Sequence, residues 1–173
     1  RWPWPRSRYA ELLGYLKEGG ASVIAFDMFF DMPDIEGAEN DFALSEAADN
    51  TGMTIFSVWS PTANLFKTRP LDGIYKGRLS ESIDIIAGSA KGVGHLNLFY
   101  DSDGVARRVP IQIADTQGKE RFMPLSLAAF LEQKGIDQKP ELSPGSLLKI
   151  GNLHMPLDSK SCIPINYIDF EKQ

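Results

Sequence analysis

The stretch Ser22-Val23-Ile24-Ala25-Phe26-Asp27 decides the fold class. Its central residues are apolar on both faces of an extended chain, which predicts a strand buried between two layers. The residues before it repeat at helical spacing over 7–17 and form one apolar stripe of Tyr9, Leu12, Leu13 and Leu16. Ser7 is expected to cap this helix and Gly19-Gly20 to end it. The chain therefore begins with a helix that leads into a buried strand.

The same order of helix and strand occurs again further along the chain. A second helix is expected to start at Asn40 or Asp41 and to end at Gly52. Residues 53–59 then form another apolar run, which predicts a second buried strand. Two helix–strand units at this spacing favour parallel strands joined by right-handed crossovers.

The second half of the chain changes to antiparallel patterns. Strands over 93–99 and 105–113 flank a turn and predict a β-hairpin. A mostly buried helix is expected over 125–134, and a small meander of strands over 147–150, 153–156 and 162–168. We therefore predict that residues 1–173 form a single α/β domain: one mixed β-sheet with flanking helices, whose antiparallel hairpin and meander lie in the C-terminal half.

Composition excludes several classes of protein. The net charge is −5, and an acidic chain is a poor candidate for nucleic-acid binding, which depends on a basic face. No apolar run approaches the roughly 20 residues that span a bilayer. The chain opens on Arg1 without a signal peptide or an initiator methionine, so we expect a fragment of a longer protein.

The motifs of common enzymes are missing from the sequence. There is no phosphate-binding loop, no His-Glu-x-x-His zinc motif and no nucleophile elbow. The two histidines, His95 and His154, lack the spacing of a zinc site, and Cys162 is expected to be a buried, inert thiol. We therefore expect no catalytic residue, no metal and no cofactor.

Four residues are the best candidates for binding a ligand. Asp27 follows a buried strand, and ligands of parallel α/β sheets gather at the carboxyl ends of strands. Arg107 shares a strand face with apolar residues, so it needs a carboxylate or an anionic ligand, and we expect it to be coupled to Asp27. His95 and Asn97 lie two residues apart on one face of their predicted strand.

Asp101, Asp103 and the long loop 60–78 can each be interpreted as structural or as functional. Asp101 and Asp103 are expected to form the hairpin turn, with a cation contact as the alternative, because the spacing of a calcium loop is not met. Residues 60–78 are rich in turn residues but also carry apolar side chains. They are expected to form either a lid near Asp27 or a surface loop.

The first residues, Trp2-Pro3-Trp4-Pro5, cannot be helical. These tryptophans either pack on the domain or lie at the headgroup level of a membrane.

The order of motifs along the chain resembles that of the type-2 CHASE (CHASE2) domain. The resemblance is carried by Trp2-Pro3-Trp4-Pro5-Arg6, Ile24-Ala25-Phe26-Asp27, Gly94-His95-x-Asn97, Asp101-x-Asp103-Gly104-Val105-x-Arg107, Pro124-Leu125-Ser126-Leu127-Ala128 and Ile165-Asn166-Tyr167. It covers essentially all 173 residues. The chain departs from the pattern at Lys160-Ser161, where a turn glycine is common, and by a polar, proline-containing insertion at 136–146.

The resemblance implies a sensor and not an enzyme. Such domains lie outside the cytoplasmic membrane of bacteria, tethered by membrane helices that lead to a nucleotide cyclase, a diguanylate cyclase, a histidine kinase or a Ser/Thr kinase. The expected partners are a small-molecule or ionic signal, the receptor's own membrane helices and its output domain, with homodimer formation left open. A stand-alone hydrolase that uses Asp27 and His95 is the alternative.

Overall fold

The computed structural model describes residues 2–61, 73–143 and 147–167. Its contacts divide the chain into two compact units. Unit 1 comprises residues 1–61, 79–96 and 125–137, and unit 2 comprises 62–78, 97–124 and 138–173. Each unit is described by itself below.

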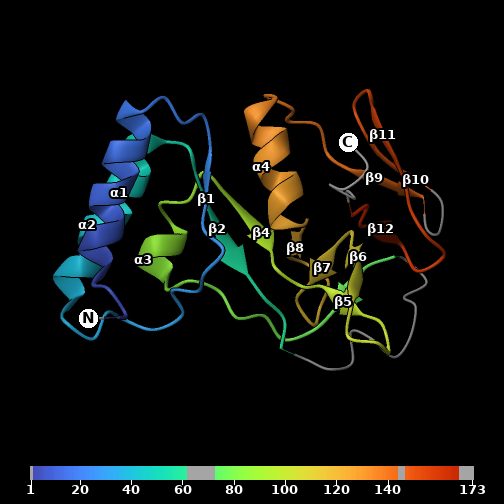
Figure 1. Ribbon diagram of the computed structural model, residues 1–173, viewed down its shortest axis with the longest axis horizontal. Helices are drawn as coiled ribbons and strands as arrows, with labels where there is room; N and C mark the ends of the chain where they lie inside the picture. Colours follow the sequence, from blue (N-terminus) through green and yellow to red (C-terminus); the bar gives the residue numbers. More distant parts are fainter. Residues whose placement is uncertain (1, 62–72, 144–146, 168–173) are drawn as a thin grey trace. The chain divides into compact units, whose positions relative to one another are not determined.

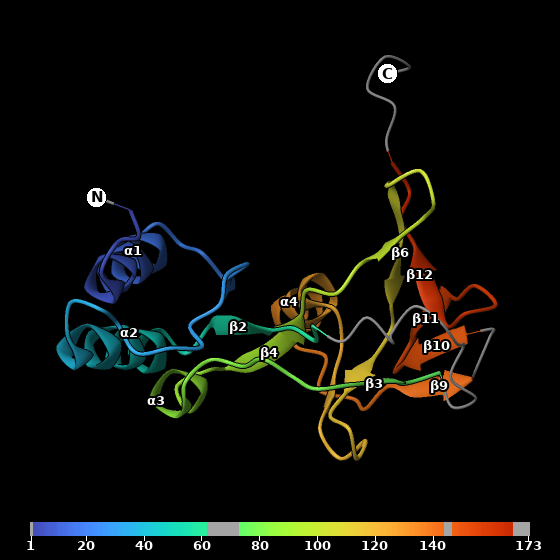
Figure 2. The same cartoon turned by 90° about the horizontal axis from the view of Figure 1, so that it is seen from below.

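Unit 1 is a small parallel sheet with helices on both faces. Its elements are α1 (Arg6–Glu18), β1 (Ile24–Ala25), α2 (Ala38–Thr51), β2 (Thr54–Val58), α3 (Asp84–Ala87), β4 (Gly92–His95) and α4 (Leu125–Gln133). The strands run parallel in the order β1-β2-β4. Figures 1 and 2 show the sheet between α1, α2 and α3 on one side and α4 on the other. The predicted helix–strand units with parallel strands are confirmed.

The core of unit 1 fills the space between the sheet and the first three helices. Phe26 of the chain after β1 stacks on Phe56 of β2, with ring centroids 5.3 Å apart, and Phe30 packs edge-on against both rings. Fully burying one such side chain stabilises the fold by about 1.5–3 kcal/mol. The buried members of this core are Tyr9, Leu13, Ile24, Phe26, Phe30, Leu44, Ala48, Phe56 and Ile86.

The first strand differs from the prediction. Ile24 and Phe26 are buried, but Ala25 and Asp27 are exposed, so this stretch is buried on one face only. The five residues of β2 are all buried, because β2 lies between β1 and β4. The stretch 22–27 therefore contributes an edge strand, β1. The central strand of the sheet is β2, and its apolar composition fits that buried position.

The start of α1 also differs from the prediction. Pro5 is the N-cap and Ser7 lies inside the helix, without a side-chain cap. Leu13 is buried, whereas Leu12 of the predicted apolar stripe is exposed. Gly20 adopts a φ of 84°, which supports the predicted end of the helix at Gly19-Gly20.

A glycine sets the distance between α4 and the sheet. A Cβ atom at Gly94 of β4 would lie 2.5 Å from the Cα and 2.9 Å from the backbone nitrogen of Leu125, the first residue of α4. Real Cβ atoms do not approach a backbone this closely. The helix can therefore pack directly on β4 only because residue 94 has no side chain.

Unit 2 is built from short strands. They are β3 (Tyr75–Lys76), β5 (Phe99–Tyr100), β6 (Ala106–Pro110), β7 (Ile113–Ala114), β8 (Arg121–Phe122), β9 (Glu141–Ser143), β10 (Leu147–Ile150), β11 (Leu153–Pro156) and β12 (Cys162–Pro164). In the described part of the unit these strands form three sheets of three strands, in the orders β12-β6-β5, β3-β7-β8 and β11-β10-β9. The pairing is antiparallel except between β3 and β7.

The mixed α/β class is confirmed, but the single mixed sheet is not. The predicted strand 93–99 is divided between β4, which joins the parallel sheet of unit 1, and β5, which starts the hairpin of unit 2. The predicted strand 105–113 is likewise divided into β6 and β7, which join different sheets. Of the predicted meander, β10 and β11 pair, whereas β12 pairs with β6.

Residues 62–72, the larger part of the predicted lid, lie outside the described residues. Ile74 and Tyr75 are buried, and Tyr75 begins β3.

The turn at Lys160-Ser161 has a backbone conformation that favours glycine. Ser161 has a φ of 59°, in the left-handed region that favours glycine. The Asp158 carboxylate holds this turn by accepting the backbone N–H groups of Lys160 and Cys162.

Candidate functional site

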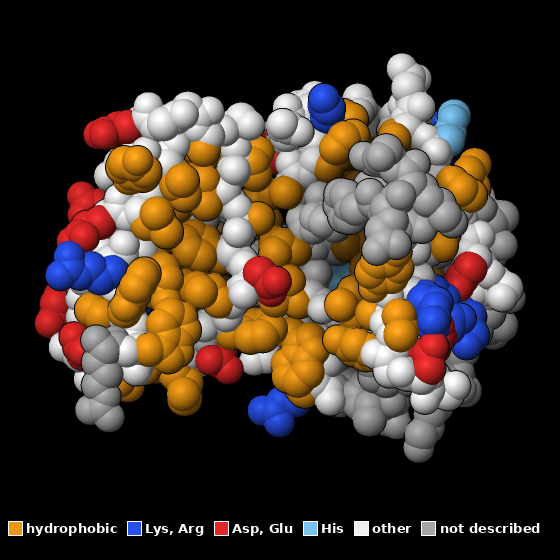
Figure 3. Space-filling model, in the orientation of Figure 1, with side chains coloured by type: hydrophobic (Ala, Val, Ile, Leu, Met, Phe, Trp, Pro, Cys, Tyr) orange, Lys and Arg blue, Asp and Glu red, His pale blue; other side chains and the backbone are white. Residues whose placement is uncertain are grey.

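A groove at the N-terminal end of unit 1 is the best-formed candidate site. It lies between residues 2–6, before and at the start of α1, and the loop 28–36 that follows β1, and its volume is about 230 Å³. Figure 3 shows hydrophobic side chains gathered over this part of unit 1, where α1 and the loop after β1 lie. All residues that line the groove belong to one unit.

Aromatic rings form one side of the groove. Trp2 and Trp4 are 68% and 53% exposed, and their rings meet edge-on with centroids 6.2 Å apart and planes inclined by 61°. Tyr9 of α1 continues this row, 6.2 Å from Trp4. Burial raises the pKa of the Tyr9 hydroxyl above its ordinary value, because the ionised form loses its hydration. The first tryptophans therefore pack on the domain while keeping much of their surface open.

Arg6 connects the groove to the buried core of unit 1 through several contacts. Its guanidinium group pairs with the buried carboxylate of Asp41 in α2 and donates a hydrogen bond to the carbonyl of Met32. The Arg6 backbone N–H donates to Asp34 Oδ2 at 2.7 Å, and the Asp34 N–H donates to the Asp41 carboxylate. The guanidinium carbon lies 5.1 Å from the centre of the Phe30 ring. One arginine thus links α1, α2 and the loop after β1.

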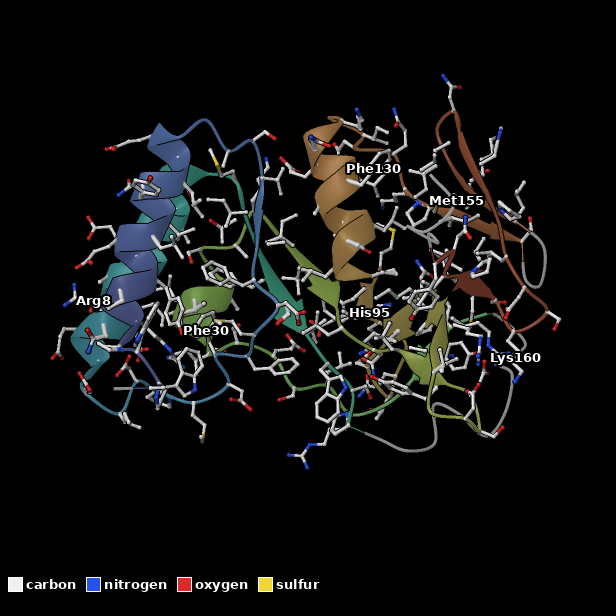
Figure 4. The ribbon with its side chains drawn as sticks, in the orientation of Figure 1. Arg8, Phe30, His95, Phe130, Met155 and Lys160 are labelled. Carbon is white, nitrogen blue, oxygen red and sulfur yellow. The ribbon has the colours of Figure 1, made fainter. Side chains whose placement is uncertain are left out.

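Figure 4 shows the contrast between the two sides of α1. Phe30 lies inside the unit beside α3, whereas Arg8 lies on the outer side of α1.

We call the contacts of Arg6 with Asp41, Asp34 and Met32 the Arg6 clamp. The sequence carries a signal for it. Asp41 falls in the same helical stripe as Leu44 and Ala48, and a carboxylate on a buried stripe needs a cation. Arg6 stands in the first turn of a helix, where the helix dipole disfavours a positive charge. Each charge is therefore unfavourable in its own helix, and the ion pair between Arg6 and Asp41 explains why both are present.

The loop side of the groove carries three carboxylates, Asp31, Asp34 and Glu36, among apolar side chains. Both oxygens of Asp34 accept backbone N–H groups, one from Arg6 of α1 and one from Glu36 of the loop. Asp31 accepts a hydrogen bond from the Ser80 hydroxyl at 3.3 Å. The Glu36 carboxylate is exposed and forms no hydrogen bond or ion pair with the described residues. The groove therefore has aromatic rings on one side and carboxylates among apolar side chains on the other.

The residues predicted for a ligand site are not gathered in this groove. Asp27 is exposed after β1 and has no hydrogen bond or ion pair among the described residues. His95 is buried at the end of β4 in unit 1, with β2 between its strand and that of Asp27. Asn97 is also buried, but it belongs to unit 2, so the predicted strand that would place it beside His95 ends between them.

Arg107 has carboxylate partners, but they are those of its own hairpin. Its guanidinium donates to Asp101 Oδ2 at 3.0 Å and to both oxygens of Asp103 at 2.9 and 2.8 Å. The neighbouring Arg108 also pairs with Asp101. A turn of four residues brings these groups together without any long-range contact, so the hairpin itself supplies the carboxylates that Arg107 needs. The expected coupling to Asp27 of unit 1 stays a prediction. Arg107 is exposed, because β6 is open on that side.

The pairing holds the pKa of the Asp103 carboxyl at about 2, through its hydrogen bonds to Arg107 and to the Val105 N–H. A carboxyl whose pKa is lowered in the folded state stabilises the fold above its unfolded pKa, and this contribution is lost as the pH falls through the folded value. Asp103→Asn is expected to lower the urea midpoint at pH 6, with a difference that shrinks between about pH 4 and pH 2. In an Arg107→Met background most of the difference should be gone at pH 6. If Asp103→Asn lowered the urea midpoint by the same amount at pH 6 and at pH 2, the lowered pKa of Asp103 would be contradicted.

Cys162 is a buried thiol in β12, as predicted. Burial and the Asp158 carboxylate raise its pKa to about 11, and the Tyr75 hydroxyl lies 3.8 Å from the sulfur. Only about one thiol in a thousand is then ionised at pH 8. Labelling with Ellman's reagent at pH 8 is expected to be more than about 100-fold slower in the native protein than in guanidinium chloride. Fast labelling without denaturant would show that the thiol is accessible.

Comparisons with known proteins identify the family. Within residues 2–61, 73–143 and 147–167, no helix is long and apolar enough to cross a membrane, and no cluster of three or more potential metal ligands is present. No curated protein and no solved structure matches the chain. The family model of the CHASE2 domain matches residues 1–173, the whole chain. The chain therefore belongs to the CHASE2 family, a family of extracytoplasmic sensory domains of signalling receptors.

Proposed function

We propose that this domain is the sensor of a bacterial transmembrane receptor, held outside the cytoplasmic membrane by membrane helices. It passes its signal through those helices to a nucleotide cyclase, diguanylate cyclase, histidine kinase or Ser/Thr kinase inside the cell. The observation that carries the proposal is the CHASE2 match over the whole chain. CHASE2 domains are sensory and not catalytic, so the domain itself is proposed to have no enzymatic activity.

The Arg6 clamp supports a mechanical link between the start of the chain and the core. Arg6 lies only four residues after Trp2 and is bonded to α2 and to the loop after β1. A displacement of the segment before α1 therefore has to move these elements or break a buried ion pair. A signal acts by binding two such arrangements with different affinity, since only a differential affinity shifts an equilibrium.

Cysteine labelling in cells tests the extracytoplasmic location. Phe42 is exposed on α2, so a Phe42→Cys variant of the full-length gene product offers an accessible thiol. The unchanged protein is the matched control, because it reports the labelling of the buried Cys162 and of any cysteine outside residues 1–173. We expect a membrane-impermeant maleimide to label the variant in intact cells clearly more than the control. Labelling of Phe42→Cys that requires rupture of the cytoplasmic membrane would refute the proposed location.

A further inference from the structure

We propose that the N-terminal groove of unit 1 binds a small quaternary ammonium cation. The groove has aromatic rings on one side, Trp2, Trp4 and Tyr9, and the carboxylates of Asp31 and Glu36 among apolar side chains on the other. Quaternary ammonium groups are recognised in proteins by the faces of aromatic rings, assisted by negative charge. The proposal deepens the proposed function by naming the class of ligand that the sensor would detect.

The geometry of the indoles favours a cation over a stacked planar ligand. Because their planes are inclined by 61°, Trp2 and Trp4 form two walls of a corner and leave ring faces open to solvent. A compact cation can contact two such walls at once, whereas a flat ring can stack on only one. The site already contains one example of this interaction, the Arg6 guanidinium over the Phe30 ring.

The charge of the groove excludes anionic ligands. Asp31, Asp34 and Glu36 line it, and the only cation of the described lining, Arg6, is neutralised by Asp41. A phosphate or carboxylate ligand would meet like charges without a free positive group. Charge complementarity therefore selects a cation.

The aromatic walls favour a cation without N–H groups. A primary ammonium carries three donors, and those that face the indole rings lose water without gaining a lone-pair acceptor. A quaternary ammonium has no donor to satisfy, so it can contact both ring faces while the carboxylates of Asp31 and Glu36 balance its charge. The volume of about 230 Å³ lies below the roughly 300–1,000 Å³ of pockets for drug-sized ligands, so the ligand is small.

Choline and its neutral carbon analogue, 3,3-dimethylbutan-1-ol, test the proposal as a matched pair of probes. Titration of choline into the ¹⁵N-labelled chain is expected to shift the indole N–H resonances of Trp2 and Trp4 along one saturating curve. The neutral analogue has the same shape and no charge, and it should bind at least tenfold more weakly. Equal affinity for the two probes, or no saturable response to choline, would overturn the proposal.

Four variants locate the site. Trp4→Ala is expected to weaken choline binding at least tenfold, Trp4→Phe to retain most of it, and the double variant Asp31→Asn/Glu36→Gln to weaken it at least fivefold. Phe42→Ala on α2 removes an exposed ring outside the groove and should change affinity less than twofold. Each variant is compared only after its spectrum shows a native fold. Unchanged binding in Trp4→Ala would overturn the assignment.

Vesicles separate ligand binding from attachment to a membrane surface. Exposed tryptophans also favour lipid headgroups, so the chain is mixed with phosphatidylglycerol vesicles, which carry no quaternary ammonium. Binding to these vesicles that depends on Trp4, without a response to choline, would replace the cation site by a lipid-binding surface. The physiological meaning of the site rests on the proposed function, but the titration does not. A failed titration leaves the cysteine-labelling result intact, and the reverse also holds.

Discussion

Arg6→Met is expected to lower the free energy of unfolding by about 3–5 kcal/mol, because it leaves the buried carboxylate of Asp41 without its cation. The substitution also removes the bond to the Met32 carbonyl and the contact with the Phe30 ring. Urea or guanidinium denaturation at pH 7 measures the loss. A loss of this size would place the clamp among the most important single contacts of unit 1.

The matched control is Arg8→Met, two residues further along the same helix. Arg8 pairs with Glu11 on the exposed face of α1, and exposed pairs of this type contribute only about 0.3–0.5 kcal/mol. Asp41→Leu in the Arg6→Met background removes the uncompensated charge and should recover a large part of the stability. Equal effects of Arg6→Met and Arg8→Met would mean that the Arg6–Asp41 pair adds nothing to the fold.

Gly94→Ala is expected to destabilise the protein by about 3 kcal/mol or more, at the upper end of the cost of overpacking. The new methyl group would lie 2.5 Å from the Leu125 Cα, and a backbone atom cannot turn aside as a flexible side chain can. The helix α4 would have to move away from β4, which opens the packing on that face of the sheet.

Gly92→Ala provides the control in the same strand and on the same face. A Cβ atom at residue 92 would meet the Ile55 Cγ1 at 3.9 Å, an ordinary contact. We expect its free energy of unfolding to change by less than about 1 kcal/mol. If both alanine variants lose the same stability, the effect arises from glycine in a strand and not from the close approach of α4.

Local patterns predicted the elements better than their partners. The helix over 7–17 and the strand over 53–59 were predictable because their apolar spacing is a local property, and both are present as α1 and β2. The spacing of residues 93–99 predicts one strand. In the structure the chain leaves the parallel sheet after His95, and it pairs with β6 only from Phe99. Which strand a short run joins depends on distant residues, so spacing alone could not divide it.

The candidate site was less predictable for the same reason. Arg107 required a carboxylate, and Asp27 was the expected one, but Asp101 and Asp103 of its own hairpin are bonded to it. Asp27 was favoured by its place after a strand, but that strand is at an edge and the residue faces solvent. The groove was not predicted, since it joins Trp4 to a loop nearly thirty residues away.

The division of the chain has a consequence for how the gene can be rearranged. Each unit is assembled from three separate stretches of sequence, which alternate along the chain. A single crossover between two genes therefore cannot exchange one unit and leave the other whole, and any cut inside 1–173 separates parts of at least one unit. Recombination that shuffles receptors must transfer the sensor as one block, with its junctions outside this segment.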